Sequence, residues 1–137
     1  MDFLNFRLID NLKGNQKGTE QNLKLEVLLM AHEQHAELIK TLHDCAAACN
    51  HCFDACLQED DVKMMAQCIR LDRECADICA YLEHAITRNS PFVAELAQAC
   101  AAICEACGDE CAKHDHDHCQ KCAEACKKCA EACRSVA

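Results

Sequence analysis

The chain has 137 residues, of which 16 are cysteine, and its 23 acidic and 14 basic side chains give a net charge of -9. Its length is that of one domain that can build a core without disulfides, and its single Pro, three Gly and lack of Trp exclude a sandwich or barrel and favour an all-α protein. The negative charge repels phosphate groups, so we expect no nucleic acid and no membrane surface among its partners.

The first 18 residues differ from the rest of the chain. Six apolar side chains occur between Phe3 and Leu12, and a Gly-Asn-Gln-Lys-Gly segment over 14–18 interrupts the pattern. We predict an amphipathic arm and linker over 1–18, followed by one bundle over 19–137. The start of the sequence lacks the features of a secretory signal, and no apolar run approaches about 18 residues. We therefore expect a cytoplasmic protein whose thiols stay reduced.

Two long helices are predicted after this arm. From Thr19, a residue type that caps helices, to Leu57 the sequence contains neither Gly nor Pro. The polar stretch over 58–61 ends this helix, and Asp60 or Asp61 can cap a second helix that we expect to run to about Arg88.

Two further helices follow. Ser90-Pro91 places a capping residue before a proline at the first helical position, which predicts a third helix to about Lys113. Asp117, with Gln120 three residues later, resembles a capping box for a fourth helix. Four helices joined by short loops predict an antiparallel up-down-up-down four-helix bundle with a short N-terminal extension.

The cysteines recur at helical spacing. The twelve residues from Cys45 and the twelve from Cys100 share seven letters, including all four cysteines. Successive cysteines within each predicted helix are three, four or seven residues apart, which places them on one inward stripe. We therefore predict a core that contains Cys45, Cys49, Cys52, Cys56, Cys68, Cys75, Cys79, Cys100, Cys104, Cys107, Cys111, Cys119, Cys122, Cys126, Cys129 and Cys133.

Three interpretations of these thiols are disfavoured. Sixteen small, oxidisable side chains would make a poor core if they were only filler. Cysteines four residues apart on a helix have Cβ atoms about 5–6 Å apart, whereas a disulfide needs about 3.8 Å. An iron–sulfur cluster usually takes its ligands from a loop that folds around it, which a rigid helix face cannot do. Metal binding by thiolates is the favoured interpretation.

Charge favours Cu(I) over zinc as the metal. Four zinc sites of four thiolates each would bury a charge of about −8 in a medium of low dielectric constant. One Cu(I) ion for each thiolate leaves the core neutral, because each ion replaces one proton. A two-coordinate ion needs sulfur atoms about 4.5 Å apart, which neighbouring turns and facing helices can supply. The sequence therefore predicts multiple Cu(I) ions in the bundle core.

The sequence from about Asp44 to Ser135 resembles the cytosolic copper storage proteins. The segments that carry the resemblance are Ala48-Cys-Asn-His-Cys-Phe53, the stretch over 68–79, Ser90-Pro-Phe92, Cys104-Glu-Ala-Cys-Gly108 and the stretch over 113–119. The resemblance implies a four-helix bundle, often tetrameric, that fills its interior with many Cu(I) ions for storage or detoxification. A homo-oligomer is thus expected. Family members commonly extend the first cysteine stripe toward the amino terminus, where this chain has Leu38 and Leu42, which would lower its capacity.

The two ends of the predicted bundle differ in chemistry. One end extends the cysteine stripes to Met64, Met65 and histidines, whereas the other extends them to apolar side chains. We predict that copper is admitted at the histidine end, where His114 is best placed by helical phase and His118 is the second candidate. The two methionines are expected to pack rather than to bind metal.

The sequence does not decide which residue faces the core at one position of the second helix. The helix skips a cysteine between Cys68 and Cys75, and both Leu71 and Asp72 lie near the inward direction there. The spacing does not decide which of them points into the core.

The favoured function is a store and buffer of Cu(I), not an enzyme. The expected ligands are the sixteen cysteines together with His114 and His118. The sequence contains no nucleophile elbow, phosphate loop or isolated carboxylate pair. A thiol-based redox enzyme or sensor is the alternative from another class, and it would need a few exposed cysteines of low pKa. A zinc-binding protein and a copper chaperone are further alternatives.

Overall fold

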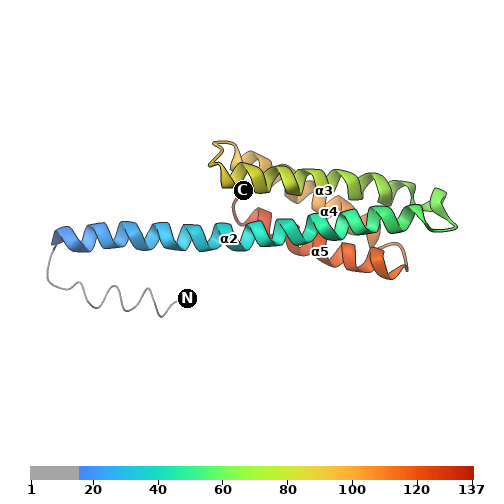
Figure 1. Cartoon of the computed structure of the whole chain (residues 1–137), viewed down its shortest axis with the longest axis horizontal. Helices are drawn as coiled ribbons and strands as arrows, with labels where there is room; N and C mark the ends of the chain where they lie inside the picture. Colours follow the sequence, from blue (N-terminus) through green and yellow to red (C-terminus); the bar gives the residue numbers. More distant parts are fainter. Residues whose placement is uncertain (1–15) are drawn as a thin grey trace. The chain divides into compact units, whose positions relative to one another are not determined.

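A computed structural model describes residues 16–137 of the chain. It contains α2 (Gln16–Leu57), the 3-10 helix η1 (Val62–Met65), α3 (Ala66–Thr87), α4 (Val93–Cys111) and α5 (Asp117–Arg134) (Figure 1). No strand occurs in this part of the chain, and the predicted all-α class is confirmed. The chain divides into two compact units, Met1–Glu37 and Leu38–Ala137. The second unit contains the cysteine-bearing bundle.

The amino-terminal arm was predicted over residues 1–18, of which 1–15 lie outside the described residues. Helix α2 begins at Gln16, three residues before Thr19, so the last part of the predicted linker is helical. A glycine inside a helix costs only about 1 kcal/mol relative to alanine, and Gly18 therefore does not stop the helix. The division into 1–18 and 19–137 stays a prediction.

The order of contacts within the bundle gives the direction of its helices. Cys45 Sγ lies 3.9 Å from Cys75 Sγ, and Cys52 Sγ lies 4.0 Å from Cys68 Sγ. Residue numbers thus rise along α2 as they fall along α3, which is the order that antiparallel neighbours produce. The thiols of α3 and α4, and those of α2 and α5, meet in the same reversed order.

The predicted starts of the last three helices differ in detail from the structure. Asp61 is the N-cap of η1, without a side-chain cap hydrogen bond, and α3 begins at Ala66.

The last two helices also start differently from the prediction. Helix α4 begins at Val93 because Pro91 and Phe92 form a turn, in which the Phe92 backbone N–H donates to Ser90 Oγ at 3.2 Å. The capping box of the fourth helix was wrong. His116 is the N-cap of α5, and Asp117 lies in its first turn, where a negative charge suits the helix dipole.

Gln120 has a different role from the one that the capping box assigned to it. Its side-chain Nε2 donates to the backbone oxygen of His114 at 2.6 Å and to that of Ala112 at 3.4 Å. The Gln120 amide therefore caps the carboxyl end of α4 instead of the amino end of α5. Its hydrogen bonds also hold the loop between these helices, which carries the histidines.

Apolar side chains fill one end of the bundle core. Leu42 and Leu82 are completely buried, and Leu38 and Ile86 are 4% exposed. Met65 is buried at the other end, whereas Met64 is 73% exposed. No helix among the described residues combines the length and the apolar character needed to cross a bilayer.

Helices α4 and α5 approach closely at Gly108. A Cβ atom at this position would lie 3.3 Å from Cys126 Cβ and 3.4 Å from the backbone oxygen of Ala123. The first distance is tighter than ordinary van der Waals contact, and the second is at the lower limit of such contact. The missing side chain thus lets the cysteines of α5 approach those of α4.

The apolar end should carry much of the stability of the metal-free bundle. We expect Leu82→Ala to lower the free energy of unfolding by about 2–5 kcal/mol, since it removes a fully buried side chain and leaves a cavity. Leu57→Ala is the matched control, because Leu57 is 50% exposed and its loss should cost under about 1 kcal/mol. Urea unfolding of the reduced protein measures both values, and equal losses would contradict this assignment.

Candidate metal centre

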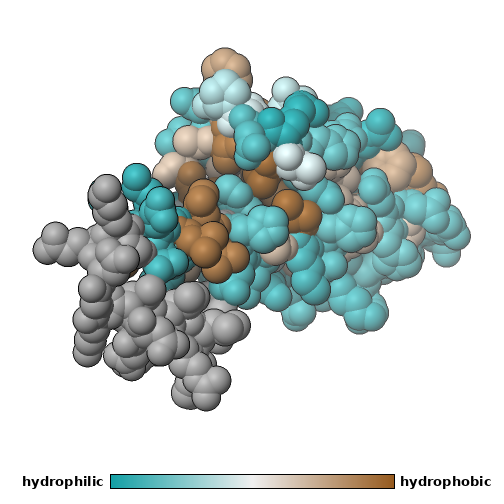
Figure 2. Space-filling model, turned by 60° about the vertical axis from the view of Figure 1, so that its left-hand side comes forward, coloured by the Kyte–Doolittle hydropathy of each residue, from teal (hydrophilic) through white to brown (hydrophobic). Residues whose placement is uncertain are grey.

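All sixteen cysteines point into the bundle. Most of the coloured surface in the view of Figure 2 is hydrophilic instead. Every cysteine is a free thiol, and every one is completely buried. They come from α2, α3, α4 and α5, so the four helices each supply part of one interior. The spacing of the cysteines predicted this inward orientation, and the structure confirms it.

The sulfur atoms lie in contact but are not bonded to one another. Their closest approach is 3.2 Å, between Cys68 and Cys111, and other neighbouring pairs lie up to 4.0 Å apart. A disulfide bond is about 2.05 Å long. The interior therefore holds thiols at separations that one metal ion can bridge with small side-chain movements.

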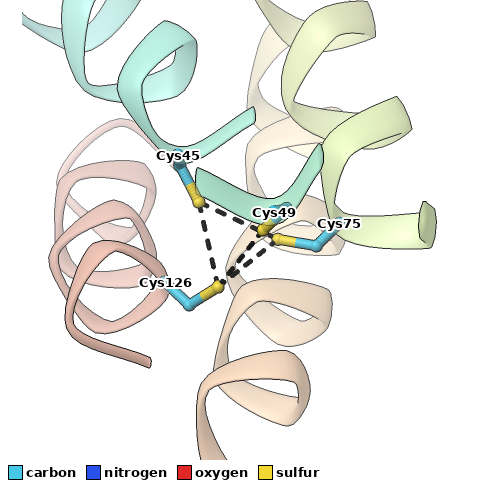
Figure 3. A group of neighbouring side chains, drawn as sticks. All are labelled: Cys45, Cys49, Cys75 and Cys126. Atoms are coloured by element: carbon cyan, nitrogen blue, oxygen red, sulfur yellow. Dashed lines mark hydrogen bonds between the residues drawn. The ribbon is translucent and has the colours of Figure 1, made fainter. Parts of the chain in front are cut away.

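Four-cysteine groups repeat through the core. In the group shown in Figure 3, Cys126 Sγ lies 3.9 Å from Cys45, 3.5 Å from Cys49 and 3.8 Å from Cys75, so the group joins α2, α3 and α5. In each such group the sulfur atoms all lie within 4.8 Å of one another. Further groups are Cys45-Cys75-Cys79-Cys104, Cys49-Cys107-Cys122-Cys126, Cys52-Cys56-Cys68-Cys119 and Cys79-Cys100-Cys104-Cys129. Because several groups share members, the thiols form a continuous stack.

His118 closes the stack at one end. Its Nδ1 atom lies 3.5 Å from Cys52 Sγ, 3.9 Å from Cys56 Sγ and 3.5 Å from Cys119 Sγ. Its side chain is 13% exposed. His118 thus stands between solvent and the group formed by Cys52, Cys56, Cys68 and Cys119.

The other predicted histidine contacts a carboxylate. His114 Nε2 lies 3.3 Å from Glu110 Oε1. Helical phase favoured His114 because it extends the stripe of α4, but the turn after α4 carries His118 toward the thiols instead. The role of His114 as a metal ligand stays a prediction.

Asp72 points into the core, which decides the position that the sequence left open. It is completely buried, whereas Leu71 is only partly buried. Four thiols donate to its carboxyl group: Cys122 at 3.3 Å, Cys107 and Cys111 at 3.4 Å, and Cys68 at 3.7 Å. The carboxyl oxygens thus occupy the place in the stack where α3 lacks a cysteine.

Burial favours the neutral form of Asp72 and of two thiols at the histidine end of the stack. It raises the pKa of Asp72 to about 10, and the nearby Cys122 sulfur adds to this effect. Burial and the neighbouring Cys68 likewise raise the pKa of Cys119 to about 12 and raise the pKa of Cys56. A low-dielectric interior disfavours any charged form. A metal ion that binds here must therefore displace protons from thiols.

Comparison with known proteins identifies the family. Residues 31–137 match the family described as Csp, copper storage protein. The chain belongs to this family. It is 58% identical over 106 residues to the "Uncharacterized cysteine-rich protein YhjQ" of Bacillus subtilis strain 168, a match that covers 77% of this chain and 98% of that protein. The family that the cysteine and Ser-Pro-Phe segments predicted is thus confirmed.

Two solved structures are similar as well. The "Cu(I)-bound Copper Storage Protein BsCsp3" is 57% identical, with a TM-score of 0.73, over 76% of this chain and 98% of that one. A cytosolic copper storage protein from Streptomyces lividans with five coppers is 43% identical, with a TM-score of 0.74, over 76% of this chain and 92% of that one.

The buried Asp72 makes stability depend on pH. Its pKa is 3.8 in the unfolded chain and about 10 in the fold, so the folded protein holds one more proton between these values. The contribution of Asp72 to stability should therefore be most favourable at low pH and should fall by up to about 1.4 kcal/mol per pH unit as the pH rises toward 10. Asp72→Asn keeps the shape of the side chain but removes the titrating carboxyl group, so it should flatten the dependence of stability on pH.

Anaerobic urea unfolding of the reduced, metal-free protein between pH 5 and pH 8 measures the effect. The comparison is between slopes, so a constant loss of stability in the variant does not affect it. Parallel slopes for the two proteins would contradict a neutral Asp72.

Proposed function

We propose that this protein stores and buffers Cu(I) ions in the interior of its bundle and is not an enzyme. The observation that carries the proposal is the stack of sixteen completely buried thiols, in which four-cysteine groups share members. Membership of the copper storage family and the Cu(I)-bound state of a relative that is 57% identical support it.

The electrostatics of the core select the ion. A Cu(I) ion that replaces one thiol proton leaves the charge of the buried stack unchanged, so loading does not bury a net charge. A divalent ion held by four thiolates would leave about two negative charges at each site, at a large desolvation cost. Thiolate sulfur is also a soft ligand that suits Cu(I).

Copper is admitted at the end of the stack that His118 covers. The imidazole is partly exposed and contacts three thiols, so it can hold an incoming ion beside the Cys52, Cys56 and Cys119 sulfurs. The opposite end is filled by Leu38, Leu42, Leu82 and Ile86. Imidazole nitrogen binds copper, whereas these hydrocarbon side chains offer no ligand atom.

The cytoplasm is the proposed location, and a homo-oligomer, such as a tetramer, is the proposed assembly. A relative that is 43% identical is described as a cytosolic copper storage protein. The abundance of free buried thiols fits a reducing compartment.

An anaerobic Cu(I) titration against a chromophoric competitor tests the storage function. We expect saturation at an ion count comparable to the sixteen thiols. Saturation at about four ions with a preference for zinc would favour a zinc protein, since zinc takes four ligands in structural sites. Fast reaction of one or two thiols, with the rest inert, would favour redox chemistry instead.

The metal-free protein should already be folded. Leucine, isoleucine and alanine side chains share the core with the thiols, so packing does not depend on copper as it depends on zinc in a zinc finger. Circular dichroism of the reduced apoprotein should show a helical chain with a cooperative thermal transition. A disordered spectrum that becomes helical only when copper is added would contradict this.

A further inference from the structure

We propose that Glu59 is a positioning residue that holds a hydrogen on Nε2 of His118, so that the Nδ1 lone pair faces the outermost thiols. The proposal rests on the proposed function, because its consequence is the rate at which the first Cu(I) ion is admitted. In the sequence, Glu59 is simply one residue of the polar stretch over 58–61 that ends the first helix.

The geometry places His118 between a carboxylate and three sulfur atoms. Its Nε2 lies 2.9 Å from Glu59 Oε1, and its Nδ1 lies 3.5 Å from both Cys52 Sγ and Cys119 Sγ. The two ring nitrogens therefore face chemically different partners on opposite sides of the ring.

The partners decide where the hydrogen lies. An ionised carboxylate only accepts hydrogen bonds, so Nε2–H must donate to Glu59. In the neutral ring Nδ1 then carries a lone pair, and the thiol hydrogens can point to it. A hydrogen bond at one ring nitrogen commonly fixes the tautomer and the orientation of an imidazole that binds metal through the other nitrogen.

The backbone and a second histidine hold Glu59 in place. The Glu59 N–H donates to the backbone oxygen of Cys56 at 3.3 Å, which ties the turn to the last thiol of α2. His116 stacks on His118 with ring centroids 5.3 Å apart, and its Nδ1 lies 3.5 Å from Glu59 Oε1. Glu59 Oε1 thus lies close to both imidazole rings. Asp61 Oδ1 lies 3.7 Å from Nε2 of His116.

Without this carboxylate, the ring can turn or can move its hydrogen to Nδ1. Either change removes the lone pair from the thiols, and a copper ion would have to wait for the ring to reorient. The sixteen thiols themselves would be unaffected. Loss of Glu59 should therefore slow the admission of copper without lowering the final number of ions.

The test combines ring NMR with copper transfer in the full-length protein. In reduced, metal-free protein, ¹⁵N shifts of His118 should show a hydrogen on Nε2 alone, and Glu59→Ala should show a mixture with the Nδ1–H form. Transfer of one Cu(I) equivalent from a chromophoric chelator complex, followed anaerobically, should slow about tenfold in Glu59→Ala. Glu59→Gln, which keeps an acceptor oxygen, should restore part of the rate.

Asp54→Asn is the matched control. Asp54 is an exposed carboxylate near the end of α2, in the segment that leads to Glu59, and it accepts a hydrogen bond from Gln58 at 2.9 Å. Its variant removes the same charge without changing a partner of His118. It should match the wild-type rate. Adding Glu59→Ala to His118→Ala should cause no further slowing, because the two residues act through one ring.

The outcomes separate this inference from the storage function. If Glu59→Ala takes up copper at the wild-type rate, or slows while Nε2 alone still carries the hydrogen, the positioning role is wrong and storage stands. If the wild-type protein itself binds few Cu(I) ions, the storage function fails, and the inference fails with it. A slowing as large in Asp54→Asn would assign the effect to charge alone and would overturn the role of Glu59.

Discussion

The structure depends on burying many sulfur atoms without burying charge. A thiol is small and nearly apolar, and it can occupy a helix core as alanine or valine does. A thiolate cannot, because a low-dielectric interior opposes its ionisation. The protein can thus keep sixteen potential ligands in a stable core as long as each holds a proton or a singly charged ion in its place. Asp72 follows the same rule, because it is buried among four thiols as a neutral acid.

The two ends of the bundle differ in their proposed roles: one end stabilises the fold, and the other end exchanges copper. Leu42 and Leu82 close one end with ordinary hydrocarbon packing, which does not change when metal binds. At the other end, His118 is partly exposed and in contact with thiols. With the proposed entry at His118, different residues provide stability and access to the metal store, so a cavity at the apolar end should not alter exchange at the other end.

Much of this architecture could be predicted from spacing alone. Cysteines at steps of three, four and seven can share a face only on helices, and sixteen of them on four helices can share only one interior. Details that depend on the exact rotation of a helix about its axis could not be predicted in this way. Leu71 and Asp72 lie on either side of the inward direction, and only packing against Cys107, Cys111 and Cys122 selects the carboxyl group.

The contacts of residues in and next to the loops could not be predicted from helical spacing either. His114 extends the stripe of α4 but lies where the chain turns, and the conformation of that turn brings His118 to the thiols instead. Glu59 lies in another loop, 59 residues from His118 in the sequence, and no periodic pattern connects them. Helical periodicity therefore predicts the cysteine stack itself, whereas the residues proposed to control access are brought together by tertiary contacts that involve loops.

Copper K-edge absorption of the fully loaded protein tests the central claim most directly, because it reports the atoms bound to the metal. The account predicts a shell dominated by sulfur at about 2.3 Å, the length of a metal–thiolate bond, with only a minor contribution from nitrogen or oxygen. The opposite result is a shell dominated by nitrogen or oxygen, together with thiols that still react with an alkylating reagent when the protein is unfolded in the presence of copper. That result would show that the buried sulfur atoms do not store the copper.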